Sequence, residues 1–514
     1  MRQYLITGIM ALAALSSMPA HAAEKVTITL EPSDSAPVIA KEIYGQFTEH
    51  LGSCIYGGIW VGEDSPIPNT NGYRNDVLQA IRDLKVPLMR WPGGCFADEY
   101  HWMDGVGPKE NRPRMVNTNW GGTVEDNSFG THEFMNLCEM LDVEPYISGN
   151  VGSGTVEELA KWVEYMTAED GPQAKLRKEN GREKPWKLKY LGIGNETWGC
   201  GGNMTPEYYS NIFRQYSTYC RNFNGNQLYK IGSGADAYNY EWTDVCMKNA
   251  GKMMDGISLH YYCVDDWDHK GSSREFDTDD HYWLMGKAYD IDTLISRHSQ
   301  IMDRYDPQKR VGLLVDEWGT WWDVEPGTNP GHLYQQNTMR DALVAAISLN
   351  VFNSHADRVR MANIAQFANV LQAMLLTKDD KMVLTPTYYV FKSYIPHQDA
   401  KLIPLKVDSE IITVRKGRQV PVVTATASEK DGVTTISMVN ISLDKAVDVD
   451  IDLAGIKASK VSGEIITSKD IHDYNDFGQE EKVTLRPFDG AKVKNGRLTL
   501  SLPAKSVVTL SLTK

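Results

Sequence analysis

The sequence predicts an α/β fold: a (β/α)8 TIM barrel with an additional all-β antiparallel sandwich of jelly-roll-like form. Eight short apolar runs alternate with helical patterns over about 330 residues, as in a barrel of βα units. Beyond about Thr385, apolar and polar residues alternate with a period of two, which is typical of strands with one buried face. The length of 514 residues is also too great for one ordinary domain.

The eight apolar runs have the length expected of buried parallel strands. They are Ile43–Phe47, Val86–Trp91, Glu144–Asn150, Lys189–Glu196, Lys230–Ala235, Gly256–Tyr262, Val311–Trp318 and Met361–Phe367. Glu196 ends the fourth run and Glu317 the seventh, so 317 − 196 = 121 residues separate them, or about three βα units. Strands four and seven lie across a barrel mouth, so both carboxylates are expected to face one cleft.

Helix signals fall between these runs. Thr155 and Glu158 have the spacing of a capping box before an apolar helical pattern. Thr205 places an N-cap residue directly before Pro206, a favoured first-turn residue. Both signals support helices between the predicted strands.

The second domain is predicted from period-two patterns, with no helical stretches beyond about Thr385. Val447, Val449, Ile451 and Leu453 alternate with aspartates, and residues 498–502 and 508–512 alternate similarly. Residues 23–40 hold an alternating strand of the same character, which is expected to join the sandwich. The predicted boundaries are therefore 23–40 for this strand, 41–384 for the barrel and 385–514 for the sandwich.

Residues 1–22 have the composition of a cleaved signal peptide. Arg2 supplies a positive charge, Ile6–Leu15 an apolar stretch too short to span a bilayer, and Ala20-His21-Ala22 a small-residue cleavage point. This pattern predicts an exported protein, either periplasmic or secreted.

Composition excludes several classes of partner. The net charge is −14 and the pI about 5.4, with no cluster of Lys and Arg, so neither nucleic acid nor an anionic membrane is expected to bind. No later segment approaches 18 consecutive apolar residues.

No metal motif, P-loop or GxGxxG spacing is present, so neither a metal nor a cofactor is predicted. The seven cysteines show no dense disulfide framework, and most are predicted to be buried small apolar residues.

The strongest functional signal is the pair Glu196 and Glu317. Each follows an apolar strand, and the carboxyl edge of a barrel is where catalytic residues lie. One carboxylic acid that protonates a leaving oxygen and one carboxylate that meets an oxocarbenium-like centre suffice to cleave a glycosidic bond. The competing interpretation is that both are ordinary charged residues in βα loops.

Other residues at the same edge are weaker candidates. Strand alternation places His260 and Tyr262 on one face. Glu49 and Gln366 follow the first and eighth strands, but a capping Glu and a core amide are comparable interpretations. Pro92-Gly93-Gly94-Cys95 ends the second strand, where two glycines permit close backbone approach to a ligand or simply form a tight turn.

Five segments together resemble the α-L-arabinofuranosidases of glycoside hydrolase family 51. They are residues 43–52 (IYGQFTEHLG), 90–96 (RWPGGCF), 100–108 (YHWMDGVGP), 192–196 (GIGNE) and 316–318 (DEW). The resemblance runs from about residue 26 to the C-terminus and is weaker in the sandwich.

The resemblance implies a retaining mechanism with Glu196 as general acid/base and Glu317 as nucleophile, whose charge is expected to raise the pKa of Glu196. By similarity, the sugar contacts are Glu49, Cys95, Trp120, Asn195, His260, Tyr262 and Gln366. It also implies an arabinose-containing oligo- or polysaccharide as substrate and a possible homo-oligomer, a hexamer in many relatives. Two features depart from the family: the signal peptide, because many relatives are intracellular, and the tryptophan-rich segment 318–322 after Glu317.

Two alternatives remain open at this stage. One is another barrel glycosidase, such as a β-xylosidase or an endo-acting glucanase. The other is a catalytically silent sugar-binding protein on the same scaffold. The sequence does not choose between arabinan, arabinoxylan and short oligosaccharides as the natural substrate.

Overall fold

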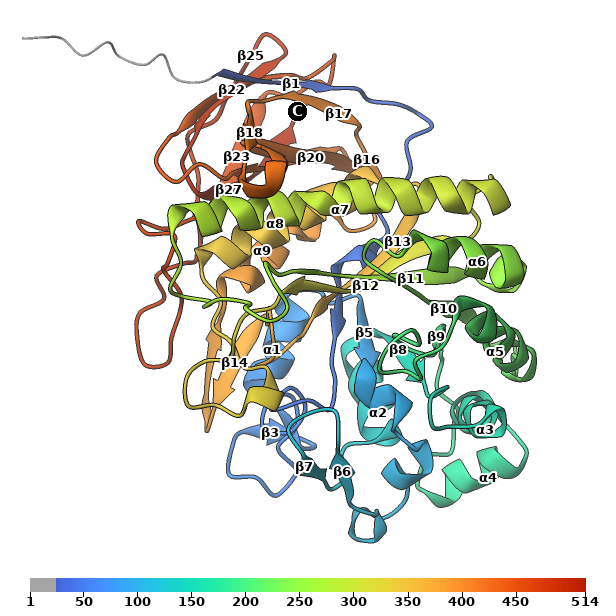
Figure 1. Cartoon of the computed structure of the whole chain (residues 1–514). Helices are drawn as coiled ribbons and strands as arrows, with labels where there is room; N and C mark the ends of the chain where they lie inside the picture. The colour runs from blue at the N-terminus through green and yellow to red at the C-terminus, as the bar shows by residue number, and fades with distance from the viewer. Residues whose placement is uncertain (1–24) are drawn as a thin grey trace, which may run out of the picture.

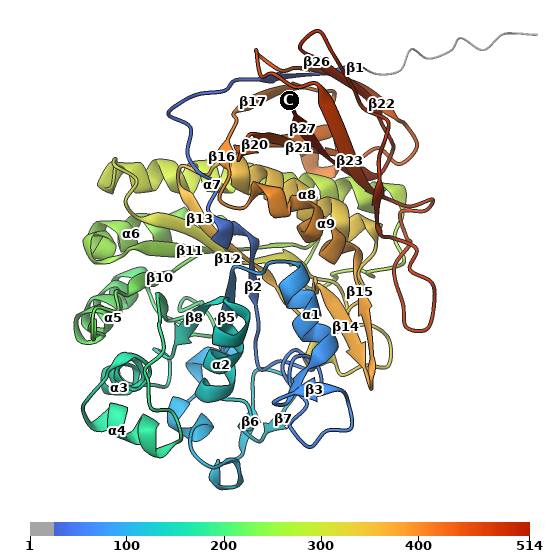
Figure 2. The same ribbon diagram turned by 180° about the vertical axis from the view of Figure 1, so that it is seen from behind.

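The computed structural model describes residues 25–514. The predicted signal peptide, residues 1–22, lies outside the described residues. Figures 1 and 2 show a barrel at one end, an all-β unit at the other, and a layer of long helices between them. Within residues 25–514, no helix is long and apolar enough to cross a membrane.

Eight parallel strands close into a barrel, which confirms the predicted fold. In chain order they are β2 (Gly45–Phe47), β5 (Leu88–Trp91), β8 (Glu144–Gly149), β9 (Tyr190–Ile193), β10 (Tyr229–Asp236), β11 (Gly256–Cys263), β12 (Gly312–Thr320) and β13 (Val359–Ala365). Each pairs in parallel with the next, and β13 pairs with β2 to complete the ring. The first strand is shorter than predicted, because Ile43 and Tyr44 belong to the 3-10 helix η1 (Lys41–Tyr44).

Helices follow most strands and surround the barrel (Figures 1 and 2). They are α1 (Asn75–Asp83), α2 (Thr131–Leu141), α3 (Val156–Thr167), α4 (Pro172–Glu179), α5 (Pro206–Tyr219), α6 (Tyr240–Ala250), α7 (Thr278–Tyr305), α8 (Met339–Ser354) and α9 (Pro386–Tyr394).

The predicted helix starts are found, with one difference. Thr155 and Thr205 cap α3 and α5 by accepting hydrogen bonds from the backbone N–H groups of Glu158 and Tyr208. The second half of the predicted capping box does not form, because the Glu158 carboxylate instead pairs with His101 at 2.9 Å.

Helix α9 contradicts the expectation that no helix lies beyond Thr385. Thr385 caps this helix and Pro386 occupies its first turn, a strong local start signal that period-two reasoning overlooked. Together with α7 and α8, it forms the layer between barrel and sandwich (Figures 1 and 2). Helix α8 is buried from Met339 to Asn353, which is why its sequence lacks a polar face.

The sandwich contains two sheets whose inner faces carry the alternating apolar residues. One sheet has the order β17 (Leu405–Asp408), β1 (Lys25–Leu30), β22 (Val447–Asp452), β26 (Arg497–Leu502), β25 (Lys492–Lys494). The other has the order β16 (Lys401–Leu402), β20 (Val423–Lys430), β21 (Val433–Asn440), β27 (Ser506–Thr513), β23 (Lys460–Thr467), β24 (Leu485–Pro487). The N-terminal strand β1 lies in the first sheet, antiparallel to β17 but parallel to β22. The exact domain boundaries stay predictions.

Short hairpins complete the described chain. They are β3 (Asn69–Thr70) with β4 (Tyr73–Arg74), β6 (Met115–Asn117) with β7 (Thr123–Glu125), β14 (Leu375–Lys378) with β15 (Lys381–Leu384), and β18 (Ile411–Thr413) with β19 (Gln419–Pro421). The β6–β7 hairpin matters for the site, because Trp120 lies in its turn.

Candidate active site

The carboxyl edge of the barrel brings all nine predicted site residues together. They come from the ends of β2, β5, β9, β11, β12 and β13 and from the β6–β7 turn. Glu317 and His260 are direct neighbours in the β11–β12 register, as expected where parallel strands share one edge. Carboxylate oxygens of Glu196 and Glu317 lie within 4.8 Å of each other, with His260 in the same group.

Glu317 is held by two donors. The Tyr262 hydroxyl donates to Oε1 at 2.8 Å, and the Arg90 guanidinium donates to Oε2 at 3.1 Å. His260 Nδ1 is 3.5 Å from the same Oε2. The side chain of Glu317 is only 11% exposed, so these groups fix both oxygens in a nearly dry environment.

Arg90 connects the two halves of the site. Besides Glu317, its guanidinium donates to Asn195 Oδ1 at 2.6 Å and to the Asp316 carbonyl at 3.1 Å. Although burial opposes it, the carboxylates of Asp316 and Glu317 raise the pKa of Arg90 above its usual value. Arg90 is therefore a permanent buried cation among the acidic groups.

His260 bridges a buried aspartate and the two glutamates. Its Nε2 forms an ion pair with Asp316 Oδ1 at 3.2 Å, and its Nδ1 lies 2.8 Å from Glu196 Oε1. Burial lowers the pKa of His260, but Glu317, Asp316 and Glu196 outweigh this and raise it to about 10. At neutral pH the ring is thus an imidazolium that donates toward Glu196.

Asp316 is the anion behind this imidazolium. Burial would raise the pKa of Asp316, but Arg90 and His260 hold it below its usual value. The Tyr146 hydroxyl donates to Asp316 Oδ2 at 2.6 Å. Asp316 therefore remains a carboxylate although it is only 1% exposed.

Glu196 lies in an unusual backbone turn. Its φ is +41°, which is uncommon for a residue other than glycine. Gly194, two residues earlier, has φ +88°, and a Cβ there would come within 2.6 Å of Val151. This turn presents the Glu196 carboxylate to Glu317.

The surroundings of Glu196 favour its protonated form. Burial raises the pKa of Glu196, the hydrogen bond from His260 lowers it, and the negative charge of Glu317 raises it again, with a net upward shift. This agrees with the direction predicted from the sequence and suits a group that must donate a proton.

Glu49 forms a second acidic centre beside Glu317. Its Oε1 accepts hydrogen bonds from the N–H groups of Gly94 and Phe96 and from Trp120 Nε1, at 3.0–3.1 Å. Its Oε2 accepts from Gln366 Nε2 at 2.8 Å. Burial, and then the charge of Glu317, raise the pKa of Glu49 to about 7.

Glycines 93 and 94 are required by this close approach. A Cβ on Gly93 would lie 2.7 Å from Glu49 Cγ, and one on Gly94 would lie 3.2 Å from Glu317 Oε2. Close approach to protein carboxylates is thus a third reason for the Gly-Gly pair, and close backbone approach to a ligand stays a prediction.

Cys95 is not the free thiol that a simple pocket cysteine would be. It forms a disulfide with Cys200, 105 residues away, with 5.6 Å between the Cα atoms. In this oxidised form Cys95 therefore offers no thiol to a thiol-directed reagent. The other cysteines, Cys54, Cys138, Cys220, Cys246 and Cys263, are free and buried, as predicted for most of them.

The tryptophan-rich segment contributes only one ring to the site. Trp318 and Trp322 are buried in the main core, whereas Trp321 packs edge-on against Tyr262 with ring centroids 4.9 Å apart. Trp267, which is 55% exposed, extends this aromatic wall toward solvent at 5.4 Å from Trp321.

Sequence reasoning assigned no role to Arg90, Tyr146, Cys200 or Asp316. A signal existed for Arg90 and Asp316, because each is a charged residue inside an apolar strand, where burial demands a partner. No comparable local signal identifies Tyr146 or Cys200, whose partners lie 170 and 105 residues away.

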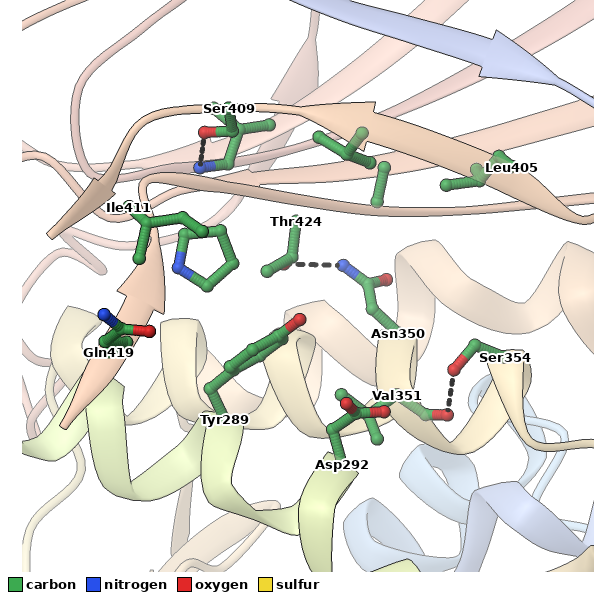
Figure 3. Close-up of a pocket in the computed structure, with 14 residues that line it drawn as sticks. Tyr289, Asp292, Asn350, Val351, Ser354, Leu405, Ser409, Ile411, Gln419 and Thr424 are labelled. Carbon is green, nitrogen blue, oxygen red and sulfur yellow. Dashed lines mark hydrogen bonds between the residues drawn. The ribbon is translucent and has the colours of Figure 1, made fainter. Parts of the chain in front are cut away.

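A separate cavity of about 350 Å³ lies between the helix layer and the sandwich (Figure 3). Asn350 donates to Thr424 at 3.1 Å across it, and Tyr289 and Ile411 line opposite sides. No predicted site residue lines this cavity, so it belongs to the packing between domains and not to the carboxylate site.

The fold and the site together define a class. Two partly buried carboxylates facing each other across the mouth of a (β/α)8 barrel, one favouring its protonated form and one held by a tyrosine and an arginine, are the equipment of a glycoside hydrolase.

Comparison with known proteins gives the family. Residues 80–281 match the family described as the alpha-L-arabinofuranosidase 1 domain, and residues 316–506 match the alpha-L-arabinofuranosidase C-terminal domain. The chain is 60% identical over 515 aligned residues to a protein of Bacteroides ovatus named intracellular exo-alpha-L-arabinofuranosidase, with 100% of both chains covered. The chain belongs to the α-L-arabinofuranosidases of glycoside hydrolase family 51 and is a glycosidase.

Solved structures agree with this. The GH51 arabinofuranosidase from Xanthomonas axonopodis pv. citri is 49% identical with a TM-score of 0.93, covering 95% of this chain and 100% of that one. The α-L-arabinofuranosidase of Thermotoga maritima, solved as an arabinose complex, is 29% identical with a TM-score of 0.83, covering 95% and 99%.

One prediction is contradicted by these findings. The Bacteroides ovatus relative, which matches over the full length, is named intracellular, and this conflicts with the predicted export to the periplasm or medium. The expectation rested on the composition of residues 1–22 alone, and a short apolar stretch after one positive charge is too weak a signal to determine the compartment.

Proposed function

We propose that this chain is a retaining, exo-acting hydrolase that releases terminal α-L-arabinofuranosyl residues from arabinan, arabinoxylan or arabino-oligosaccharides. The observation that carries the mechanism is the approach of the Glu196 and Glu317 carboxylate oxygens to within 4.8 Å. Retaining enzymes hold their carboxyl groups about 5–5.5 Å apart, whereas inverting enzymes leave about 6.5–9.5 Å for a water molecule.

In the first step, Glu196 protonates the glycosidic oxygen while Glu317 attacks the anomeric carbon. The raised pKa of Glu196 supports its role as the acid. Tyr262 and Arg90 aim the Glu317 oxygens and exclude other orientations of this side chain. In the second step, Glu196 acts as base toward the water that releases the sugar from Glu317.

The sugar is proposed to contact the residues around the two carboxylates. Glu49, held by Gly94, Phe96, Trp120 and Gln366, offers a buried acceptor for sugar hydroxyls. Asn195, His260 and Tyr262 contact Arg90, Glu196 and Glu317 respectively, and the Cys95–Cys200 disulfide borders Glu196. The arabinose complex of the Thermotoga maritima relative supports this choice of sugar.

The stereochemistry of the first product tests the mechanism. Two inversions at one carbon predict that α-L-arabinofuranose appears first, which NMR can observe before mutarotation. A β-anomer appearing first would mean that Glu317 activates water and is not the nucleophile. A chromogenic α-L-arabinofuranoside should be cleaved much faster than the matching β-xyloside, and the reverse ranking would overturn the substrate assignment.

The natural glycan and the assembly state are tested separately. Linkage-defined arabino-oligosaccharides should be shortened from the non-reducing end, one residue at a time, whereas internal cleavage would contradict exo action. A homo-oligomer, a hexamer by family resemblance, is expected in light scattering of the purified chain.

A further inference from the structure

Two sulfur atoms and one carboxylate oxygen converge beside the proposed acid/base. Cys95 Sγ is 3.9 Å and Cys200 Sγ 3.7 Å from Glu196 Oε2. Cys95 begins the 3-10 helix η2 (Cys95–Asp98) after β5, and Cys200 lies in the turn after β9. The three groups thus come from two loops that the barrel register holds together.

The spacing of these atoms suits a tetrahedral metal ion. With Zn–S of about 2.3 Å and Zn–O of about 2.0–2.2 Å, a tetrahedral site separates sulfur and oxygen ligands by about 3.5 Å. Both sulfur-to-Glu196 distances are within a few tenths of an ångström of that value. Only the two sulfurs, now bonded to each other, would have to move apart.

Two buried polar side chains, Asp98 and Asn195, lie beside the two cysteines. Asp98 ends the helix that Cys95 begins, is only 3% exposed, and has a buried Oδ2 without a hydrogen-bond partner. A Cβ on Gly201, the residue after Cys200, would lie 2.9 Å from that oxygen. Asn195 Nδ2 donates toward Cys200 Sγ at 3.9 Å, a contact that also suits a thiolate. Burial raises the pKa of Asp98 to about 8, so this residue offers a polar oxygen and not a full negative charge, and the Asn195 amide is the group that directly contacts a sulfur.

We propose that reduction of the Cys95–Cys200 disulfide creates an inhibitory site for a thiophilic divalent cation such as Zn²⁺. A dithiol reductant transfers two electrons and two protons to the disulfide, yielding two cysteine thiols and its own cyclic disulfide. The cation then displaces the two thiol protons and binds both thiolates and the Glu196 carboxylate, with water in the fourth position. Glu196 can no longer deliver a proton, so turnover stops.

The site is accessible to both reagents. Cys200 is exposed, and Cys95 and Glu196 are half-buried, whereas the five free cysteines are buried. The oxidised chain is therefore the control for zinc binding by other cysteines, because it retains all five other thiols and lacks only the two at the site. A chain reduced under native conditions and then denatured should contain seven titratable thiols. The oxidised chain, denatured without reduction, should contain five.

Zinc binding is measured directly by competition with a chromophoric chelator, so the result does not depend on the catalytic proposal. The reduced chain should bind one Zn²⁺, with an affinity more than about 100-fold higher than that of the oxidised chain. Mutation of groups outside the ligand set already lowers metal affinity by about 10–100-fold, so loss of two ligands should lower it further. Cobalt should give thiolate-to-metal charge-transfer absorption in the reduced chain only. Where the chain is active, one equivalent of Zn²⁺ should abolish turnover of the reduced form, EDTA should restore it, and the oxidised form should be unaffected.

Two variants complete the test. Reduced Cys200→Ser should lose the tight zinc binding and the cobalt absorption, whereas reduced Cys246→Ala, a change at a buried cysteine of α6, should keep both. Equal zinc affinity in the oxidised and reduced chains would overturn the proposal, as would unchanged binding by Cys200→Ser. A native chain that still yields five thiols after reduction would also overturn it, because the site could not form.

Discussion

The two halves of the carboxylate site, one around Glu317 and one around Glu196, differ in how they hold a glutamate. Glu317 receives hydrogen bonds from Tyr262 and Arg90 and is fixed by a continuous strand, β12. Glu196 lies in a left-handed turn, with an imidazolium on one oxygen and a disulfide beside the other. Donors on both oxygens suit a nucleophile, whereas burial beside a like charge suits a proton donor. The difference shows that surroundings, and not residue type, assign the two roles.

Glu317→Ala should have the largest effect. Without a nucleophile no glycosyl-enzyme forms, so kcat should fall by more than about 10⁴-fold, comparable to losses on removal of nucleophiles elsewhere. Added azide should restore part of the turnover and give the β-configured arabinofuranosyl azide. Glu241→Ala, at an exposed position of α6, should retain normal activity. Normal activity in Glu317→Ala would remove Glu317 from the mechanism.

Glu196→Ala should have a smaller effect that depends on the leaving group. A poor leaving group needs protonation, so its cleavage should slow by about 10²–10⁴-fold, the usual range for a general acid. An activated aryl group should suffer much less in the first step. Steady-state and burst kinetics with aryl arabinofuranosides of graded pKa measure this, and equal losses across the series would contradict the acid role.

Asp316→Asn should weaken the charge interaction that keeps His260 protonated between Glu196 and Glu317. Removing the anion beside Nε2 should lower the pKa of His260 from about 10, because an imidazolium loses its charge partner. The turnover number should fall by about 10–100-fold, less than for loss of the acid itself. NMR titration of the imidazole, assigned by comparison with His260→Gln, tests the shift.

Asp323→Asn, just beyond β12, is the matched control and should leave the His260 pKa unchanged. A His260 titration in Asp316→Asn identical to that of the parent would mean that Asp316 does not maintain the imidazolium.

Glu49→Gln should have the smallest effect, on stability. The pKa of Glu49 is raised from 4.5 to about 7, so its stabilising contribution is complete below pH 4.5 and is lost as the pH rises through 7. Replacing it with Gln should stabilise the fold by about 1–3 kcal/mol at pH 8 and by little at pH 4.5. The unpartnered Gln366 Oε1 can accept from the new amide after a flip. Thermal unfolding at both pH values measures this, and an equal shift at each would contradict the assigned cause.

The sequence by itself determined the elements whose signals are local. Eight apolar runs specified eight barrel strands, because buried parallel strands need continuous apolar residues. Period-two alternation specified β22, β26 and β27 of the sandwich and the N-terminal strand that joins it, whereas the other sandwich strands were not predicted individually. Strand ends predicted that Glu196 and Glu317 share one edge, since parallel strands present their carboxyl ends together. The roles of the nine site residues remain proposals.

Only the tertiary structure decided which distant groups meet. The Cys95–Cys200 disulfide joins residues 105 apart, and the Tyr146–Asp316 hydrogen bond joins residues 170 apart. Such pairs depend on the register of the barrel strands and on the path of the loops. The sequence around either residue of a pair reveals neither. The absence of a polar face indicates that helix α8 is buried, but only the structure shows that the sandwich domain covers its outer face. The charge state of His260 likewise follows from three carboxylates that only the closed barrel brings to one ring.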